Sequence, residues 1–147
     1  MSKNNRPPRV FFNASVIIAG LNSPSGGSAK LLRQAKEKQI IGIISEIIID
    51  EVLRHSDKLK KSKSEIDKNL KMIFSSINQA PSAPEVEKWQ KVVIDAGDAH
   101  VLAAAKESNS RFLVTLDQKH LLILQNKVKK FRIVSPKQLI EYLKYLL

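Results

Sequence analysis

Acidic side chains follow apolar segments of this sequence at several widely separated points. Glu51 lies on the segment after "IIGII", Asp98 lies where a loop meets the alanine-rich stretch "AHVLAAA", and Asp117 comes just after "RFLVT". Clustered carboxylates repel one another unless a cation neutralises them, and carboxylate oxygens are the ligands that Mg²⁺ and Mn²⁺ take. These residue types therefore predict a divalent-cation site, where an ion activates water for phosphodiester hydrolysis.

Polar residues of other kinds occur beside these acids. Asn13 and Ser15 follow the first apolar segment, Asp95 precedes Asp98 by three residues, and Thr115 precedes Asp117 by two. The amide oxygen of Asn13 can ligate a hard cation or hold a water molecule, but it brings no negative charge. We therefore expect Asn13 at the site with the acids, and Ser15, Asp95 and Thr115 in supporting places.

Each acid also has an ordinary structural interpretation. Asp98 is well placed to cap the alanine-rich helix, Asp117 to cap a helix beginning "QKHLL", and Glu51 to pair with a lysine at an edge. These alternatives stay open for single residues. The three histidines, His55, His100 and His120, are isolated in the sequence and are interpreted as packing or surface residues.

The elements that must position these residues alternate along the chain. Strands are predicted at 9–13, 40–44, 111–115 and 130–134, because these runs are short, apolar and continuous. Helices are predicted from Ser28 to about 38, from Ser45, from about 64, from near Asp98, and from Ser135 with Pro136 at the first helical position. Alternating strands and helices indicate a parallel sheet covered on both faces, with sites at the carboxyl ends of the strands.

Length and composition set outer bounds. The chain of 147 residues is expected to form one domain over 9–147, after a short polar arm at 1–8. The absence of cysteine excludes disulfides, thiol catalysis and thiolate metal sites. No apolar run is long enough for a membrane span and no signal peptide is recognisable, so a cytoplasmic location is expected.

The charge balance favours a polyanionic partner. Lys and Arg number 25 against 14 for Asp and Glu, a net charge of +11, which is typical of proteins that bind nucleic acid. Aromatic residues are not interleaved with basic ones in the sequence, so a base-stacking platform is not expected. Two basic runs are candidate RNA contacts, although such runs also occur as plain solvated faces. Their members are Lys58, Lys60, Lys61, Lys63, Lys127, Lys129, Lys130 and Arg132.

Five stretches, taken in order, resemble the PIN-domain family, and within it the small prokaryotic PIN proteins found as toxins of toxin–antitoxin pairs. They are "VFFNASVIIAG", "IISEIIIDEVL", "DAGDAHVLAAA", "FLVTLDQKHLL" and "RIVSPKQLIEYL". The resemblance implies a three-layer α/β/α sandwich with a central parallel sheet of four to five strands. It also implies an endoribonuclease dependent on Mg²⁺ or Mn²⁺, with a possible antitoxin partner and a possible homodimer.

The family's acidic site falls on Asn13, Glu51, Asp98 and Asp117, as both catalytic and metal-binding residues. Family members usually carry an aspartate where this chain has Asn13, so the resemblance implies impaired activity. Two alternatives stay open: a catalytically inactive module that binds RNA or a partner, and a receiver-like phosphoacceptor domain with Asp117 as nucleophile.

Overall fold

Five parallel strands form the single central sheet in the computed structural model, which describes residues 6–146. The strands are β1 (Arg9–Phe12), β2 (Ile41–Ser45), β3 (Ser76–Asn78), β4 (Phe112–Val114) and β5 (Arg132–Val134), in the order β3-β2-β1-β4-β5. Each neighbouring pair is parallel, so all five carboxyl ends meet at one edge. Most of the predicted arm at 1–8 lies outside the described residues.

The central strands form the core because they are apolar on both faces. Val10, Phe11 and Phe12 of β1 have no exposed surface, and the same is true of Phe112, Leu113 and Val114 of β4. A strand that is buried on both faces must be covered by helices on each side. The predicted parallel sheet of four to five strands is therefore confirmed.

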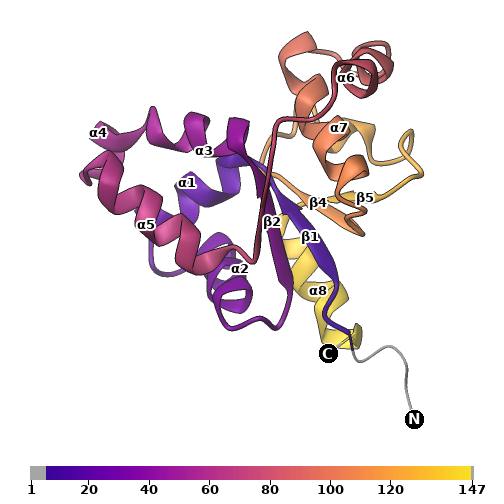
Figure 1. Cartoon of the computed structure of the whole chain (residues 1–147). Helices are drawn as coiled ribbons and strands as arrows, with labels where there is room; N and C mark the ends of the chain where they lie inside the picture. Colours follow the sequence, from indigo (N-terminus) through magenta and orange to yellow (C-terminus); the bar gives the residue numbers. More distant parts are fainter. Residues whose placement is uncertain (1–5, 147) are drawn as a thin grey trace.

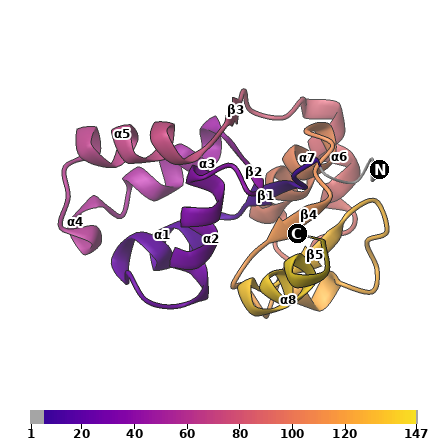
Figure 2. The same cartoon turned by 90° about the horizontal axis from the view of Figure 1, so that it is seen from below.

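Helices cover both faces of the sheet and extend to one side as a wing (Figures 1 and 2). Those that lead into and form the wing are α1 (Ala14–Asn22), α2 (Gly27–Lys36), α3 (Glu46–Leu53), α4 (Ser56–Leu59) and α5 (Lys63–Ile73). The others are α6 (Ala83–Gln90), α7 (Ala99–Glu107), α8 (Pro136–Leu146) and the short 3-10 turns η2 (Ala96–Asp98) and η3 (Leu122–Leu124). Helix α8 packs against β4, β5 and α2, whereas α7 packs against β1, β4 and α6, which gives the predicted α/β/α layers.

Gly42 lets α2 come close to the sheet. A Cβ atom on Gly42 would lie 2.9 Å from Ala35 Cβ and 2.9 Å from Phe74 Cδ1. Contacts this short are repulsive, so a larger residue would push α2 or Phe74 away from β2.

Several predicted boundaries are correct and others are wrong. Ser45 caps α3 by accepting a hydrogen bond from Ile48 N at 3.3 Å, and α8 begins at Pro136, as expected. Ser28 does not cap α2, which already includes it. The first strand ends at Phe12, and the apolar run after it forms α1, which was not predicted.

Two further elements were not predicted. They are strand β3, which contains Ile77, and helix α6, which follows it in the chain. Within residues 6–146, every helix is too short or too polar to cross a lipid bilayer.

Candidate functional site

The candidate site is at the carboxyl edge of the sheet, where β1 and β4 end side by side. Asn13 directly follows β1, and its backbone N–H donates to Val114 O of β4 at 3.0 Å. Thr115 directly follows β4, and its backbone N–H donates to Val134 O of β5 at 3.0 Å. The hydrogen bonds between the strands thus continue one residue past β1 and β4, and they hold Asn13 and Thr115 next to each other.

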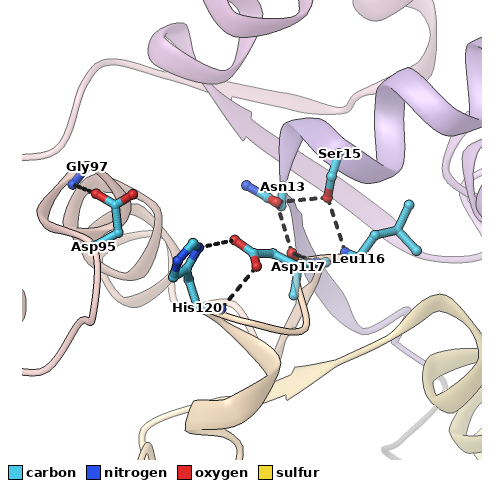
Figure 3. A network of polar contacts seen from close by, with 8 residues as sticks. Asn13, Ser15, Asp95, Gly97, Leu116, Asp117 and His120 are labelled. Carbon is cyan, nitrogen blue, oxygen red and sulfur yellow. Dashed lines mark hydrogen bonds and ion pairs between the residues drawn. The ribbon is translucent and has the colours of Figure 1, made fainter.

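Two hydroxyl groups hold the side chain of Asn13. Ser15 Oγ and Thr115 Oγ1 each donate to Asn13 Oδ1 at 2.9 Å (Figure 3). Each hydroxyl also accepts a backbone N–H: Leu116 N donates to Ser15 Oγ and Asp117 N to Thr115 Oγ1, both at 3.1 Å. The supporting positions predicted for Ser15 and Thr115 therefore correspond to direct contacts with residue 13.

This arrangement fixes which way the amide of Asn13 points. Because each hydroxyl already accepts a backbone N–H, its proton is directed to an acceptor, and the oxygen of Asn13 is that acceptor. The nitrogen Nδ2 then points away from Ser15, as Figure 3 shows. An amide nitrogen has no lone pair to offer a cation, so Asn13 presents a hydrogen-bond donor where an aspartate would present a second oxygen.

Asp117 is tied to His120 on the turn after β4. Its Oδ1 accepts the backbone N–H of His120 at 3.0 Å, and its Oδ2 lies 3.4 Å from His120 Nδ1. Asp117 thus does cap a local turn, as its structural interpretation suggested, while its side chain still faces the site. Both oxygens lie near His120, and no lysine within residues 6–146 forms an ion pair with them, so Asp117 does not resemble a phosphoacceptor nucleophile.

Asp98 lies at the start of α7 but does not cap it. Its side chain makes no capping hydrogen bond, and its Oδ2 is buried without a hydrogen-bond partner among the described residues. The capping role belongs to Asp95 instead, whose Oδ1 accepts the backbone N–H of Gly97 at 2.9 Å in η2. Ligand atoms of Asp95, Asp98 and His120 all lie within 4.8 Å of one another.

Glu51 reaches the same region from α3. Its Oε1 lies 3.7 Å from His100 Nε2 and is buried without a hydrogen-bond partner in the part of the chain that the structure describes. The lysine pairing suggested for Glu51 is not found within residues 6–146, where the imidazole of His100 is the basic side chain nearest to its carboxylate.

Burial and mutual repulsion act on these acids together. Burial raises the pKa of Glu51 above its ordinary value of 4.5, and the charge of Asp98 raises it further, while Arg54 and His55 oppose the rise. Burial likewise raises the pKa of Asp98 above 3.8, with Asp117 and Asp95 adding to the rise and His120 opposing it. Burial lowers the pKa of His100 below 6.5, so this histidine is neutral at pH 7 and does not offset the acids.

The donor set fits a divalent cation on the side of Asp98. Two carboxylate oxygens there, Glu51 Oε1 and Asp98 Oδ2, lack hydrogen-bond partners among residues 6–146, and the acids repel each other. A cation held by Asp95, Asp98 and His120 would satisfy the oxygen of Asp98 and reduce the repulsion among the acids. Asn13 does not fit as a ligand, because its oxygen already accepts two hydroxyl protons.

The basic runs named in the sequence lie on two different parts of the molecule. Residues 58–63 belong to the wing around α4 and the start of α5, and residues 127–132 lie in the loop before β5 and at its start (Figure 1). The structure therefore does not join the two runs into one surface beside the acids.

Sequence reasoning missed His100 and His120 as neighbours of the site. The spacing of His120 from Asp117, three residues, places both on one turn, and that spacing was a usable signal. His100 on α7 lies near Glu51 on α3, and these residues are far apart in the sequence, so no local sequence pattern predicts their proximity.

Comparisons with known proteins agree with this architecture. Residues 9–119 match the family model described as "PIN domain". A comparison with curated protein sequences found no match.

Three solved structures share the fold at low sequence identity. VapBC2 of Rickettsia felis, bound to a promoter DNA fragment, is 16% identical with a TM-score of 0.61, covering 86% of this chain and 97% of its own. FitAB bound to a DNA fragment is 16% identical with a TM-score of 0.62, covering 86% and 94%. VapC20 of Mycobacterium tuberculosis, a toxin that cleaves the sarcin–ricin loop, is 12% identical with a TM-score of 0.55, covering 75% and 91%. Because the family model spans most of the chain, this protein belongs to the PIN-domain family.

Proposed function

We propose that this protein is a PIN-type endoribonuclease that depends on a divalent cation and is weakened by Asn13. The observation that carries the proposal is the gathering of Glu51, Asp98 and Asp117 at one edge of the sheet, where two buried carboxylate oxygens lack partners among the described residues. Such an arrangement costs stability without a ligand, and it is typical of sites built for function.

Asp98 would hold the cation together with Asp95 and His120, whose ligand atoms lie within 4.8 Å of its own. We propose Asp117 and Glu51 as further ligands, because the charge of Asp117 acts on Asp98 and the charge of Asp98 acts on Glu51. A bound divalent cation supplies positive charge that lowers the pKa of a water molecule and stabilises the leaving oxygen. The imidazole of His120 is a softer ligand than a carboxylate and favours Mn²⁺ over Mg²⁺. His120 also keeps Asp117 oriented through its backbone N–H.

Asn13 weakens this site in two ways. It removes one negative charge from the acidic edge, and it places the NH₂ group of its amide where the free oxygen of an aspartate would be. Both effects oppose cation binding, and we expect at least ~10²-fold lower activity than in an Asn13→Asp variant.

RNA is the proposed substrate. The net charge of +11 supplies the attraction to a polyanion, and VapC20, which shares the fold, is a toxin that cleaves an RNA loop. VapBC2 and FitAB are complexes with a partner protein, so we also propose a cognate antitoxin. A homodimer of the domain at 9–147, located in the cytoplasm, is proposed from the family resemblance alone.

Cleavage of a mixed RNA pool tests the proposal. The parent, Asn13→Asp and the double variant Asn13→Asp/Asp98→Asn are compared in Mn²⁺, in Mg²⁺ and in EDTA. We expect metal-dependent cleavage that rises about 100-fold in Asn13→Asp and is lost in the double variant. Cleavage that persists in EDTA or in the double variant would point to a contaminating nuclease and would remove support for the proposal.

One observation favours a second candidate function. Because the oxygen of Asn13 accepts two hydroxyl protons and its NH₂ group takes the place of a second oxygen, the protein could be a PIN-like module that binds RNA or a partner without cutting. RNA binding with no cleavage by the parent or by Asn13→Asp would establish this second function instead.

A further inference from the structure

A cavity of about 380 Å³ lies against the outer edge of β5, away from the acidic side chains. The loop before β5, the strand itself and helix α8 form its walls, and Val128, Phe131 and Ile133 give it a buried apolar floor. None of the described residues that line it is acidic, whereas Lys129 and Arg132 contribute positive charge. The cavity therefore suits an anion with an apolar part.

An aromatic ring and a guanidinium group meet in the cavity wall. Arg132 Nη1 donates to the hydroxyl of Tyr142 at 2.8 Å, and its Cζ lies 5.1 Å from the centre of the ring. Phe112 supports the Tyr142 ring at 5.7 Å between centroids. In the sequence the aromatic residues are not interleaved with basic ones, but α8 brings Tyr142 to Arg132 from ten residues away.

Two amide side chains provide directional polar groups. Gln125 Nε2 donates to Gln138 Oε1 at 2.6 Å, and Gln138 Oε1 also accepts the N–H of Ser135 at 2.9 Å. Within residues 6–146, these bonds leave Gln125 Oε1 as an acceptor and Gln138 Nε2 as a donor. An amide donor and an amide acceptor in the wall of one cavity can bond to the polar edge of a nucleobase.

The same glutamine makes an added peptide strand a poor occupant. Strand β5 is the last strand of the sheet, so its outer side is the place where an extended peptide would pair. Gln125 Nε2 already donates to the outward carbonyl of Ile133 at 3.0 Å. A peptide would have to displace this side chain, whereas a nucleobase would use it.

The cavity also lies close to the candidate site through the sheet. Val134, at the end of β5 and in the cavity wall, accepts the N–H of Thr115, which in turn donates to Asn13. Strands lie about 4.8 Å apart, so β5 and β1 are separated by roughly 10 Å. A few linked nucleotides can span that distance.

We propose that this cavity binds one nucleobase of a single-stranded RNA, with Tyr142 against the base and Arg132 and Lys129 on the adjoining phosphates. The inference rests on the proposed function for its substrate class and adds a binding site beside the acidic edge. Through this cavity the protein would bind RNA without the cation.

The test measures binding in EDTA, where no metal-dependent cleavage takes place. A fluorescent single-stranded oligoribonucleotide of six residues is titrated with the parent, Tyr142→Leu, Tyr142→Phe and Arg132→Gln/Lys129→Gln. A Lys68→Gln variant, which removes a charge from exposed α5 on the wing, is the control. An abasic strand of the same length separates base contacts from phosphate contacts.

We expect Tyr142→Leu to weaken binding of the normal strand about tenfold and to leave the abasic strand unaffected. Tyr142→Phe keeps the aromatic ring, so its affinity for the normal strand should be within about twofold of that of the parent. This affinity also reports on whether α8 stays folded when residue 142 is changed. The double variant should lower the slope of log K against log salt by about 0.7 for each phosphate that it no longer neutralises, and Lys68→Gln should not.

Three results would overturn the inference. Weakening in Lys68→Gln that is half of that in the double variant, and so equal for each charge removed, would show only diffuse charge attraction. Equal weakening for normal and abasic strands in Tyr142→Leu would exclude stacking on a base. Polyglutamate could instead displace the oligonucleotide, and the variants could lose affinity for polyglutamate but not for RNA. That result would show that the cavity binds an acidic protein. Each result concerns binding, so it leaves the cleavage test of the proposed function separate.

Discussion

Replacing Asn13 by Asp changes one functional group and leaves its supports in place. The hydroxyls of Ser15 and Thr115, each 2.9 Å from Oδ1, donate to a carboxylate as readily as to an amide. The new oxygen replaces an NH₂ group and adds a charge beside acids whose pKa values are already raised. The same substitution should therefore weaken the metal-free fold and strengthen cation binding.

The two effects have measurable sizes. In EDTA, we expect Asn13→Asp to lose about 1 kcal/mol of unfolding free energy, which lowers the melting temperature by about 2–4 °C. If the carboxylate tightens Mn²⁺ binding about 100-fold, a concentration equal to the parent's Kd stabilises the parent by about 0.4 kcal/mol and the variant by about 2.7 kcal/mol. The Mn²⁺-induced rise in melting temperature is then about 5–9 °C larger in the variant.

Differential scanning fluorimetry with and without Mn²⁺ measures the melting temperature in EDTA and its rise on metal binding, and RNA cleavage in the same buffers measures activity. Asn22→Asp, which makes the same change at the exposed last residue of α1, is the control for metal binding. It should cost about 0.3–1 kcal/mol, because a negative charge opposes the helix dipole there, and it should show no gain in Mn²⁺ response or in activity. An Asn13→Asp variant with the parent's metal response and the parent's activity would refute the reasoning, because residue 13 would then limit neither property.

Three other substitutions test the remaining contacts of the site and the sheet. Asp98→Asn should add about 0.5 kcal/mol to the unfolding free energy in EDTA at pH 7, because it removes the charge of a half-buried carboxylate that solvent partly screens. The raised pKa means that the folded state binds the proton of Asp98 more tightly than the unfolded state does. The gain in stability from Asp98→Asn should therefore grow as pH rises from the ordinary value of 3.8 through the raised pKa, and it should vanish below 3.8. A gain that grows toward acidic pH would contradict this prediction. Thr115→Val should cost about 1–3 kcal/mol in urea unfolding, because it leaves the N–H of Asp117 without its acceptor and frees Asn13, and a neutral result would show that water replaces the hydroxyl. Gly42→Ala should cost about 1–3 kcal/mol, since its Cβ meets Ala35 Cβ and Phe74 at 2.9 Å, and an unchanged urea midpoint would mean that α2 moves freely.

The strands that carry the site were predictable because each is apolar throughout. Phe12 and Val114 end runs that are buried on both faces, so the polar residues after them could be placed at one edge by the parallel-sheet rule alone. That rule does not depend on helix boundaries, and it brought Asn13 and Thr115 together correctly.

The missed elements lacked such signals. Helix α1 is built from "ASVIIAG", whose apolar run is as typical of a buried strand, and only the turn at Asn13 decides between them. Strand β3 has three residues and one apolar side chain, and it forms because β2 offers an open edge. The position of His120 near Asp95 and Asp98 depends on two turns of irregular backbone, which the periodicity of the sequence does not predict.

The hydroxyl pair around residue 13 also bears on how this gene can change. Ser15 and Thr115 are oriented by backbone groups of Leu116 and Asp117, so they hold an amide and a carboxylate equally well and need no compensating mutation. Asparagine and aspartate codons differ by a single base in the first position. One transition in the DNA therefore separates the form with the amide from the form with the carboxylate, and selection can cross between them in one step in either direction.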